Sequence, residues 1–161
     1  MKFIVLVGKD NTGKSKTLEK TIDELIKKGA IVKDYSSHKL NNFKTYIANK
    51  SGLNPRKYKD ITIVLELGTH LIGITTYGDD RSFVQSKVNF FEDIGCTHII
   101  FASHPSGSVY EYLVELAEAR NFQDFHAIFK VGCLNITNHS NLKKLQDDSD
   151  NHAINEILHW I

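Results

Sequence analysis

The apolar run at the start of the chain, MKFIVLV, constrains the fold more than any other feature. A strand with one face in water alternates apolar and polar residues, whereas this run is apolar almost throughout. Such a strand is covered on both faces, which is typical of a parallel sheet packed between helices. The run therefore predicts an α/β fold.

A polar loop and then a helix are expected after this run. The loop reads GKDNTGKS and contains two glycines. In the stretch KSKTLEKTIDELIKKG, apolar residues recur at helical spacing, and the lysines and Gly29 at its end are a normal helix stop. The local order is therefore strand, glycine loop, helix.

Strands and helices continue to alternate along the chain. Two β-rich runs, at 61–66 and 70–76, are expected to form an antiparallel hairpin. The other expected strands are AIVKDY, THIIFAS and HAIFKVG. The other expected helices are RSFVQSKVNFFEDIG, SGSVYEYLVELAEARNF with Ser106 or Ser108 as its cap, a short one at about 43–50, and a last one that begins near Leu142 or His152 and ends at Trp160. This order predicts one doubly wound sheet.

Length and composition fit such a fold. The 161 residues match one domain spanning 1–161, and 41% hydrophobic with 24% charged residues is near the average for globular proteins. Cys96 and Cys133 are far apart and are expected to be buried free thiols. No segment is long and apolar enough to cross a membrane, and no secretory signal opens the chain, so we expect a cytoplasmic protein without a membrane partner.

The glycine loop carries a pattern that binds phosphate. GKDNTGKS satisfies G-x-x-x-x-G-K-[ST], the Walker A pattern, in which the glycines let backbone N–H groups point inward at phosphate oxygens. The Lys14 ammonium then reaches the terminal phosphates, and the Ser15 hydroxyl is a ligand for Mg²⁺. The helix that starts near Lys14 directs the positive end of its dipole to the same place. The expected nucleotide-binding residues are Gly8, Lys9, Asp10, Asn11, Thr12, Gly13, Lys14, Ser15, Lys16 and Thr17, with Thr17 near the α-phosphate.

With a buried strand before this loop and an amphipathic helix after it, the chain resembles the P-loop NTPase superfamily. The resemblance is specific at residues 8–15 and extends in outline over the alternating pattern. It implies a three-layer α/β fold with a mostly parallel sheet and a β-hairpin. It also implies a bound nucleoside triphosphate, with ATP expected, Mg²⁺ as cofactor, and Lys14 among the catalytic residues.

The resemblance also implies a carboxylate that holds Mg²⁺ at the end of a neighbouring strand. Asp79 is the first candidate, Asp80 the second and Glu66 a distant third. In an antiparallel hairpin Glu66 lies at the turn, whereas the strand before Asp79 leads into a helix and another buried strand, as in a right-handed crossover. The usual pattern has the acid directly after the apolar run, and here four residues intervene, so Asp79 can instead orient water or an acceptor.

Two further residues are candidates for catalysis. His104 follows the buried strand THIIFAS, at the edge where ligands bind in open α/β sheets, and can sense the γ-phosphate or position a nucleophile. Arg81 follows the GDD turn and can stabilise charge on the transferred phosphoryl group. Ordinary turn chemistry at His104 and a solvated surface position for Arg81 are the alternatives.

Three functions fit these residues. The first is hydrolysis of ATP, with missing parts supplied by a protein partner or a second copy. The second is a small kinase that transfers the γ-phosphate to a nucleotide or another small acceptor, with residues 36–59 as its lid. The third is a nucleotide-binding interaction module with little turnover. Hydrolysis is favoured over transfer because the chain has only three Arg residues and lacks an Arg-rich lid.

The overall charge gives no reason to expect nucleic acid as a partner. Twenty Lys and Arg residues face 19 Asp and Glu residues, for a net charge of +1. The stretch KLNNFKTYIANKSGLNPRKYK combines basic and aromatic residues, a mixture that can bind single strands. A solvated helix with its aromatic residues in the core is the favoured interpretation of that stretch.

Overall fold

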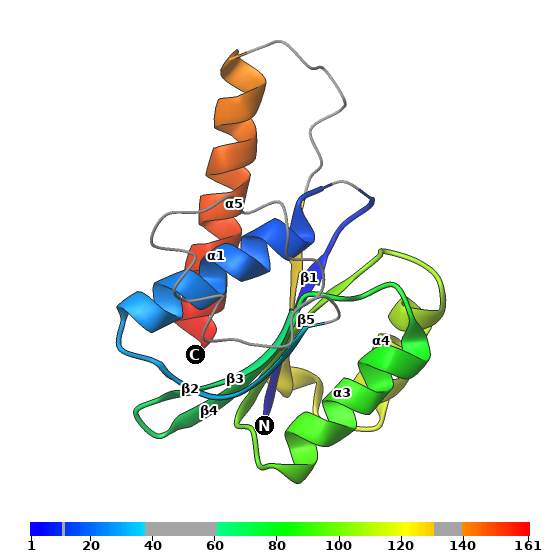
Figure 1. The fold of residues 1–161 in the computed structure, drawn as a ribbon. Helices are drawn as coiled ribbons and strands as arrows, with labels where there is room; N and C mark the ends of the chain where they lie inside the picture. The colour runs from blue at the N-terminus through cyan, green and yellow to red at the C-terminus, as the bar shows by residue number, and fades with distance from the viewer. Residues whose placement is uncertain (11, 38–60, 131–139) are drawn as a thin grey trace.

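The computed structural model describes residues 1–10, 12–37, 61–130 and 140–161 (Figure 1). Its strands are β1 (Lys2–Val7), β2 (Ile31–Ser37), β3 (Ile61–Leu67), β4 (His70–Thr75), β5 (His98–Ser103) and β6 (Phe125–Phe129). Its α-helices are α1 (Lys14–Lys27), α3 (Arg81–Asp93), α4 (Ser108–Glu118) and α5 (Ser140–Trp160), and a 3-10 turn at Phe122–Asp124 precedes β6. Apart from β2, β3 and β4, which follow one another without a described helix between them, strands and helices alternate as the sequence pattern predicts.

The six strands form one mixed sheet in the order β2-β3-β4-β5-β1-β6. β4, β5, β1 and β6 pair in parallel, whereas β3 runs antiparallel to both β2 and β4. The expected hairpin is therefore confirmed, with Thr62 opposite Thr75 and Leu67 opposite His70. The carboxyl ends of β1, β4, β5 and β6 lie at one edge of the sheet, where the loops that follow them meet.

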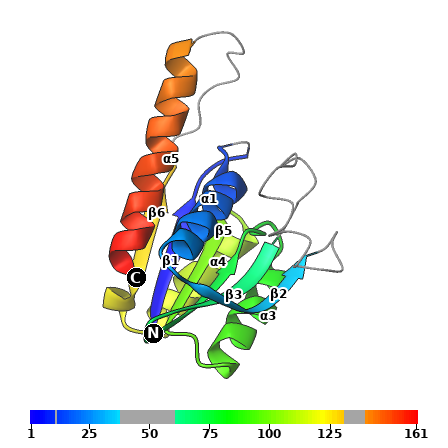
Figure 2. The ribbon, with the colours of Figure 1, turned by 60° about the vertical axis from the view of Figure 1, so that its left-hand side comes forward.

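Helices cover both faces of this sheet. α1 and α5 lie on one face, and α3 and α4 lie on the other (Figures 1 and 2). Side chains alternate along β1, so that Ile4 and Leu6 pack in a cluster with Leu18 of α1, while Phe3 and Val5 pack with Phe91 of α3 and its neighbours. The apolar run at the start of the chain is thus buried on both sides, which is the reason that it lacks polar residues.

Two details of the sequence prediction differ from the structure. α4 begins after Gly107, which has φ 90°, and no side chain caps this helix, so the expected Ser106 or Ser108 cap is wrong. The last helix begins at Ser140, slightly before the earlier of the two expected starts. Cys96 is buried, whereas Cys133 and the expected helix at 43–50 lie outside the described residues. In the ranges that the structure describes, no helix combines the length and apolar character needed to span a membrane.

Candidate functional site

The glycine loop connects the carboxyl end of β1 to the first turn of α1. It leaves the sheet between β5 and β6, with Gly8 N–H donating to Ser103 O at 3.0 Å and Lys130 N–H donating to Val7 O at 2.7 Å. Gly13 is the N-cap of α1 and adopts the left-handed conformation, with φ 77°, which L side chains rarely adopt. Asn11 lies outside the described residues. The loop thus forms at the edge where the sequence pattern places it.

The first turn of α1 presents backbone donors. No side chain from the described part of the chain caps this helix, and its first turn contains no acidic residue. The first N–H groups of a helix have no acceptor within the helix itself, and the helix dipole adds positive potential there. This end of α1 is therefore suited to an anionic ligand.

Lys14 extends its ammonium group over the loop. Its Nζ donates to Gly8 O at 2.7 Å and to Lys9 O at 3.0 Å. Burial lowers the pKa of Lys14, and the carboxylates of Asp79 and Asp10 oppose this effect by raising it. The ammonium thus lies within the field of two acids at the mouth of the loop.

Ser15 connects the loop to the end of β4. Its Oγ donates to Thr76 O at 3.2 Å. Because Thr76 directly follows β4, this bond fixes the distance between the start of α1 and the segment that carries Asp79. The hydroxyl thus joins the first turn of α1 to the segment that follows β4.

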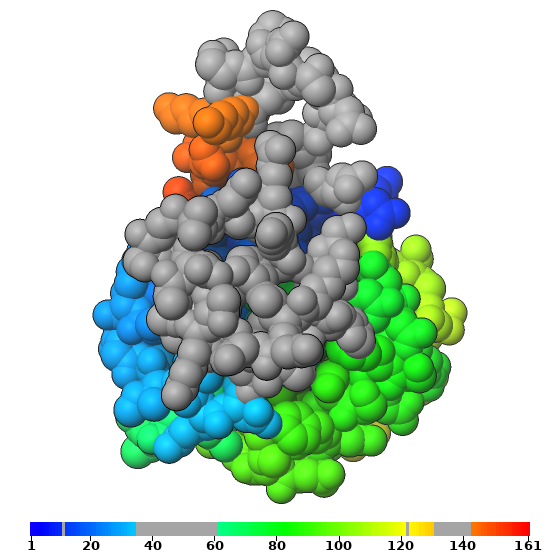
Figure 3. Space-filling model, in the orientation of Figure 1, coloured from blue at the N-terminus to red at the C-terminus, as the bar shows by residue number. Residues whose placement is uncertain are grey.

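Asp79 and His104 lie together above the ends of β4 and β5. Asp79 Oδ1 is 2.8 Å from His104 Nε2, and Asp10 Oδ1 is 3.4 Å from the same nitrogen. A Cβ at Gly78 would lie 2.0 Å from Ala102 O, so only glycine lets the chain cross the end of β5 and bring Asp79 to His104. In the space-filling view, the dark blue loop after β1 meets the yellow-green segment after β5 at the surface (Figure 3).

The side chains of Asp10, Asp79 and His104 are accessible to solvent. The side chains of Asp10 and Asp79 are 86% and 62% exposed, and that of His104 is 25% exposed. His104 contacts both carboxylates, and the charges of the same two acids act on the Lys14 ammonium. We call Asp10, Lys14, Asp79 and His104 the front group.

Asp80 and Arg81 have other partners. Asp80 is the N-cap of α3, where Oδ1 accepts from Phe83 N at 2.7 Å and from Ser82 Oγ at 2.6 Å, and these bonds lower its pKa. Arg81 forms a fork with Glu115 of α4, with Nη1–Oε1 at 3.1 Å and Nη2–Oε2 at 2.5 Å. Asp80, the second candidate for the metal, is thus directed to a helix end. The guanidinium of Arg81, expected to be catalytic, is directed to Glu115 of α4.

Glu66 lies at the far end of the sheet from the loop. It pairs with Leu71 beside the hairpin turn, and its Oε2 is 2.9 Å from Lys33 Nζ. The antiparallel register therefore separates Glu66 from Lys14 and places Asp79 on the side of the loop. The predicted positions of the two acids in the hairpin are therefore confirmed, and the role of Asp79 at a metal stays a prediction.

Thr17 faces the interior and not the mouth of the loop. Its side chain is fully buried, with Oγ1 3.1 Å from Gly13 O, 3.2 Å from Asp150 Oδ1 and 2.6 Å from Lys130 Nζ. The expected contact with an α-phosphate does not fit this position, because the hydroxyl is already surrounded by protein groups. Thr17 instead joins α1 to β6 and α5.

A buried ion pair that the sequence does not reveal lies behind the loop. Lys130 Nζ bonds to Asp150 Oδ1, and their side chains are 0% and 2% exposed. Lys20 Nζ lies 3.0 Å from Asp150 Oδ2, and Gln146 Nε2 lies 2.9 Å from Asp150 Oδ1. We call Thr17, Lys20, Lys130, Gln146 and Asp150 the rear cluster.

The rear cluster supports the loop directly. Gln146 Nε2 also donates to Thr12 O at 3.4 Å, and a Cβ at Gly13 would lie 3.6 Å from Lys130 Nζ. Burial raises the pKa of Asp150, but hydrogen bonds from Lys130, Gln146 and Lys20 outweigh burial and hold the pKa at about 2. Asp150 is therefore a fixed anion that ties three elements to the back of the loop.

The remaining loop residues complete the turn. Thr12 Oγ1 donates to Lys9 O at 3.0 Å, and a Cβ at Gly8 would meet the same Thr12 oxygen at 2.6 Å. Lys9 and Lys16 are exposed beside the loop. The tight contact at Gly8 explains why the first position of the pattern is glycine in this chain.

Among the described residues, no group of three or more His, Cys, Asp or Glu side chains is arranged to hold a metal ion. A magnesium ion at the front group would therefore need oxygens from a ligand, as is usual where Mg²⁺ binds with a nucleotide. The chain was also compared with family models, curated proteins and solved structures, and none of the three comparisons found a match.

Proposed function

We propose that this protein is a small P-loop NTPase that binds a magnesium nucleoside triphosphate, with ATP expected, and hydrolyses its γ-phosphate. The observation that carries the proposal is the start of α1, which no described side chain caps. This start directly follows a glycine loop and bears Lys14 over that loop. A helix start of this kind offers several N–H donors and a positive potential to one anion.

The phosphate chain would replace the present acceptors of Lys14. The carbonyls of Gly8 and Lys9 now accept from its ammonium, and both are neutral. A phosphate oxygen is a stronger acceptor because the hydrogen bond is then charged on both sides. Burial already lowers the pKa of Lys14, which means that the ammonium is partly desolvated and gains from an anionic partner.

The chemistry of the residues present fits Mg²⁺. The Ser15 hydroxyl and the Asp79 carboxylate are oxygen ligands of the kind that Mg²⁺ prefers. Ser15 lies in the first turn of α1 and bonds to Thr76 O, and Asp79 follows three residues after Thr76. When bound, the ion would neutralise charge on the β- and γ-phosphates. Asp80 has no part in this assignment, because it caps α3.

Asp79 and His104 provide the groups for hydrolysis. Where Ser15 and the nucleotide hold Mg²⁺ without Asp79, the exposed Asp79 carboxylate instead orients the attacking water, and His104 holds that carboxylate through the 2.8 Å contact. The water oxygen attacks the γ-phosphorus, the bond from that phosphorus to the bridging oxygen breaks, and the diphosphate leaves with the electron pair. The proton released by the water passes to solvent or to the phosphate product. Lys14 stabilises the charge on the departing oxygens.

The test is titration of the full chain with Mg-ATP by calorimetry, followed by phosphate release measured with and without nucleotide acceptors. Lys14→Ala is expected to weaken binding by about 10- to 100-fold, because a charged hydrogen bond to phosphate is lost. Lys27→Ala is the matched control, since Lys27 is an exposed lysine at the other end of α1.

Each outcome discriminates among the three functions. Phosphate release in water without an acceptor supports hydrolysis. Turnover that needs an acceptor supports the kinase, and binding without turnover supports an interaction module. Wild-type chain that binds no magnesium nucleotide, or Lys14→Ala that binds as tightly as Lys27→Ala, contradicts the proposal at its first step.

A further inference from the structure

We propose that two copies of this chain associate through β6, which pairs antiparallel with the same strand of the second copy about a two-fold axis at Ala127. Phe129 of each copy then lies beside the apolar groove of the other. This surface is separate from the front group, so the proposal does not depend on the proposed function.

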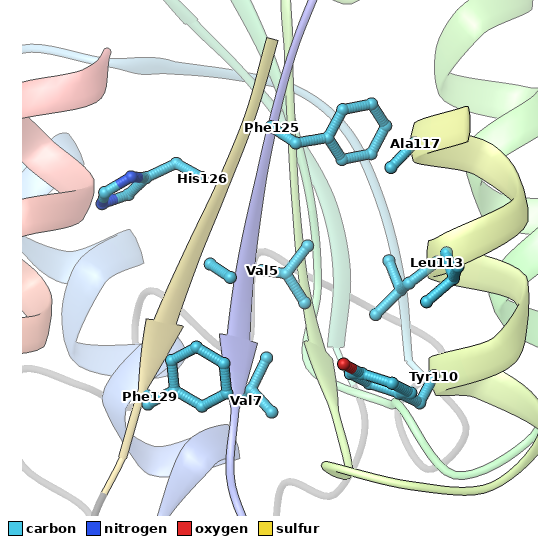
Figure 4. A pocket seen from close by; sticks show the side chains of 10 residues that line it. Val5, Val7, Tyr110, Leu113, Ala117, Phe125, His126 and Phe129 are labelled. Atoms are coloured by element: carbon cyan, nitrogen blue, oxygen red, sulfur yellow. The ribbon is translucent and has the colours of Figure 1, made fainter. Parts of the chain in front are cut away.

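The groove lies between β6, β1 and α4. Its volume is about 270 Å³, and its wall contains Val5 and Val7 of β1, Leu113 and Ala117 of α4, and Phe125 and Phe129 of β6 (Figure 4). Phe129 is 68% exposed. An aromatic side chain that is open to water beside an apolar groove favours coverage by another molecule.

The outer edge of β6 carries backbone hydrogen-bonding groups that no strand of the described residues pairs with. β6 is the last strand of the described sheet and pairs with β1 alone. Because Lys130 N–H donates to Val7 O, the even-numbered residues of this strand face β1. The N–H and C=O groups of Phe125, Ala127 and Phe129 consequently point away from the sheet, as they do along any edge strand.

The two edges of the sheet differ in how they are protected. β2 at the other edge carries the exposed charges of Lys33 and Asp34, and its register with β3 shifts between Val32 and Asp34. Charges and bulges of this kind prevent strand pairing between molecules. β6 reads FHAIF, with neither a Lys, Asp, Glu or Pro nor a register shift against β1. Within the described sheet, β6 is therefore the edge that lacks these protections against a further strand.

The sequence of β6 is nearly symmetric about Ala127, which favours a second copy as the partner. Antiparallel pairing about this residue places Phe125 opposite the partner's Phe129, and Phe129 opposite the partner's Phe125. All three outward-facing residues then fall in hydrogen-bonded pairs, and the aromatic pairs lie on the face of the groove. A two-fold interface needs just such a self-complementary patch.

The opposite face of β6 is already covered. His126 stacks on Trp160 of α5 with ring centroids 4.1 Å apart and lies 3.6 Å from Glu156. Ile128 is buried in the core cluster on that side. The accessible part of the strand is therefore its outer edge and the face that lines the groove.

The test is sedimentation velocity of the full chain over a wide concentration range. We expect a concentration-dependent dimer, and Ala127→Pro should weaken it by at least about tenfold, because each copy loses one donor between the molecules. The N–H of Ala127 points outward, so proline there keeps the hydrogen bonds to β1. Phe129→Lys is a second variant, expected to weaken the dimer through its charge at the edge.

Ile31→Lys is the matched control, because Ile31 is 60% exposed on the opposite edge strand. It should leave the dimer intact. Amide exchange at Phe125, Ala127 and Phe129 should slow as concentration rises, while exchange at the even-numbered residues should stay the same. A chain that remains monomeric at every concentration overturns the proposal. The outer edge of β6 would then be a candidate site for a strand of another protein. A dimer that survives both Ala127→Pro and Phe129→Lys overturns it in favour of another surface.

Discussion

The two sides of the glycine loop carry similar charged groups in opposite environments. In the front group, Asp10 and Asp79 are 86% and 62% exposed. In the rear cluster, Lys130 and Asp150 are 0% and 2% exposed and bond to each other. The rear charges are satisfied entirely by the protein, whereas the front charges are open to solvent and to a ligand. The comparison indicates that the rear cluster holds the loop, whereas the front group is accessible to a ligand.

Burial decides what a substitution on each side should change. A buried charge that loses its partner stays in a medium of low polarity without compensation, so stability falls. An exposed carboxylate loses little stability when it is neutralised, because water and salt already screen it. Changes in the rear cluster should therefore reduce stability, and changes in the front group should reduce turnover.

The largest effect is expected from Asp150→Asn. This substitution leaves Lys130 buried without an anion and weakens the bond to Lys20, so the free energy of unfolding should fall by about 3 kcal/mol or more. Urea denaturation measures the change. Asp148→Asn, at an exposed position of the same helix, is the control and should change stability by less than about 0.5 kcal/mol.

A double variant sharpens this result. Lys130→Met combined with Asp150→Leu removes both charges and fills the same space with apolar groups. Most of the stability lost in Asp150→Asn should return, since buried ion pairs replaced by apolar residues are often neutral or stabilising. Equal stability of Asp150→Asn and wild type would show that the rear cluster does not hold the loop.

The contacts of the rear cluster could not be predicted from the sequence. Lys130 and Asp150 are 20 residues apart, directly after a strand and in a helix, with no shared motif. Their contact depends on β6 lying beside β1 and on α5 packing along α1, and neither arrangement follows from local patterns. The one sequence signal for this ion pair is Lys130, which interrupts the apolar stretch HAIFKVG. A lysine there needs a counter-ion only if its side chain is buried.

The fold and the front group were more accessible to prediction. The strands, the hairpin and the glycine loop follow from local periodicity and turn residues, which act over a few residues. The hairpin register also ordered Asp79 before Glu66, because antiparallel pairing sends the two acids to opposite ends of the sheet. The sequence also predicts Asp80 and Arg81 at this edge, but their side chains have other partners. Asp80 caps α3, and Arg81 binds Glu115.

Asp79→Asn tests the front group and should have the next largest effect. If the carboxylate orients water or holds the metal, phosphate release should fall by about 100-fold, while nucleotide binding and unfolding free energy change little. Single-turnover kinetics and calorimetry separate the two quantities. Glu66→Gln, at the far end of the sheet, should leave both unchanged. Loss of turnover in Glu66→Gln but not in Asp79→Asn would reverse the assignment.

The smallest effect is expected when the pH is lowered. The resulting change in unfolding free energy separates the contribution of the Asp150 charge from that of its packing. The folded-state pKa of about 2 lies below the ordinary value of 3.8, so ionised Asp150 stabilises the folded chain above the ordinary value. That contribution should decline as pH falls from about 4 to about 2, because the folded form then takes up the proton. The measured quantity is the difference in unfolding free energy between wild type and Asp150→Asn, in which the titration of other acids largely cancels. The difference should be constant from about pH 8 to about pH 5 and shrink below about pH 4. A difference that stays constant down to about pH 2 would mean that shape, and not charge, holds α5 against the loop.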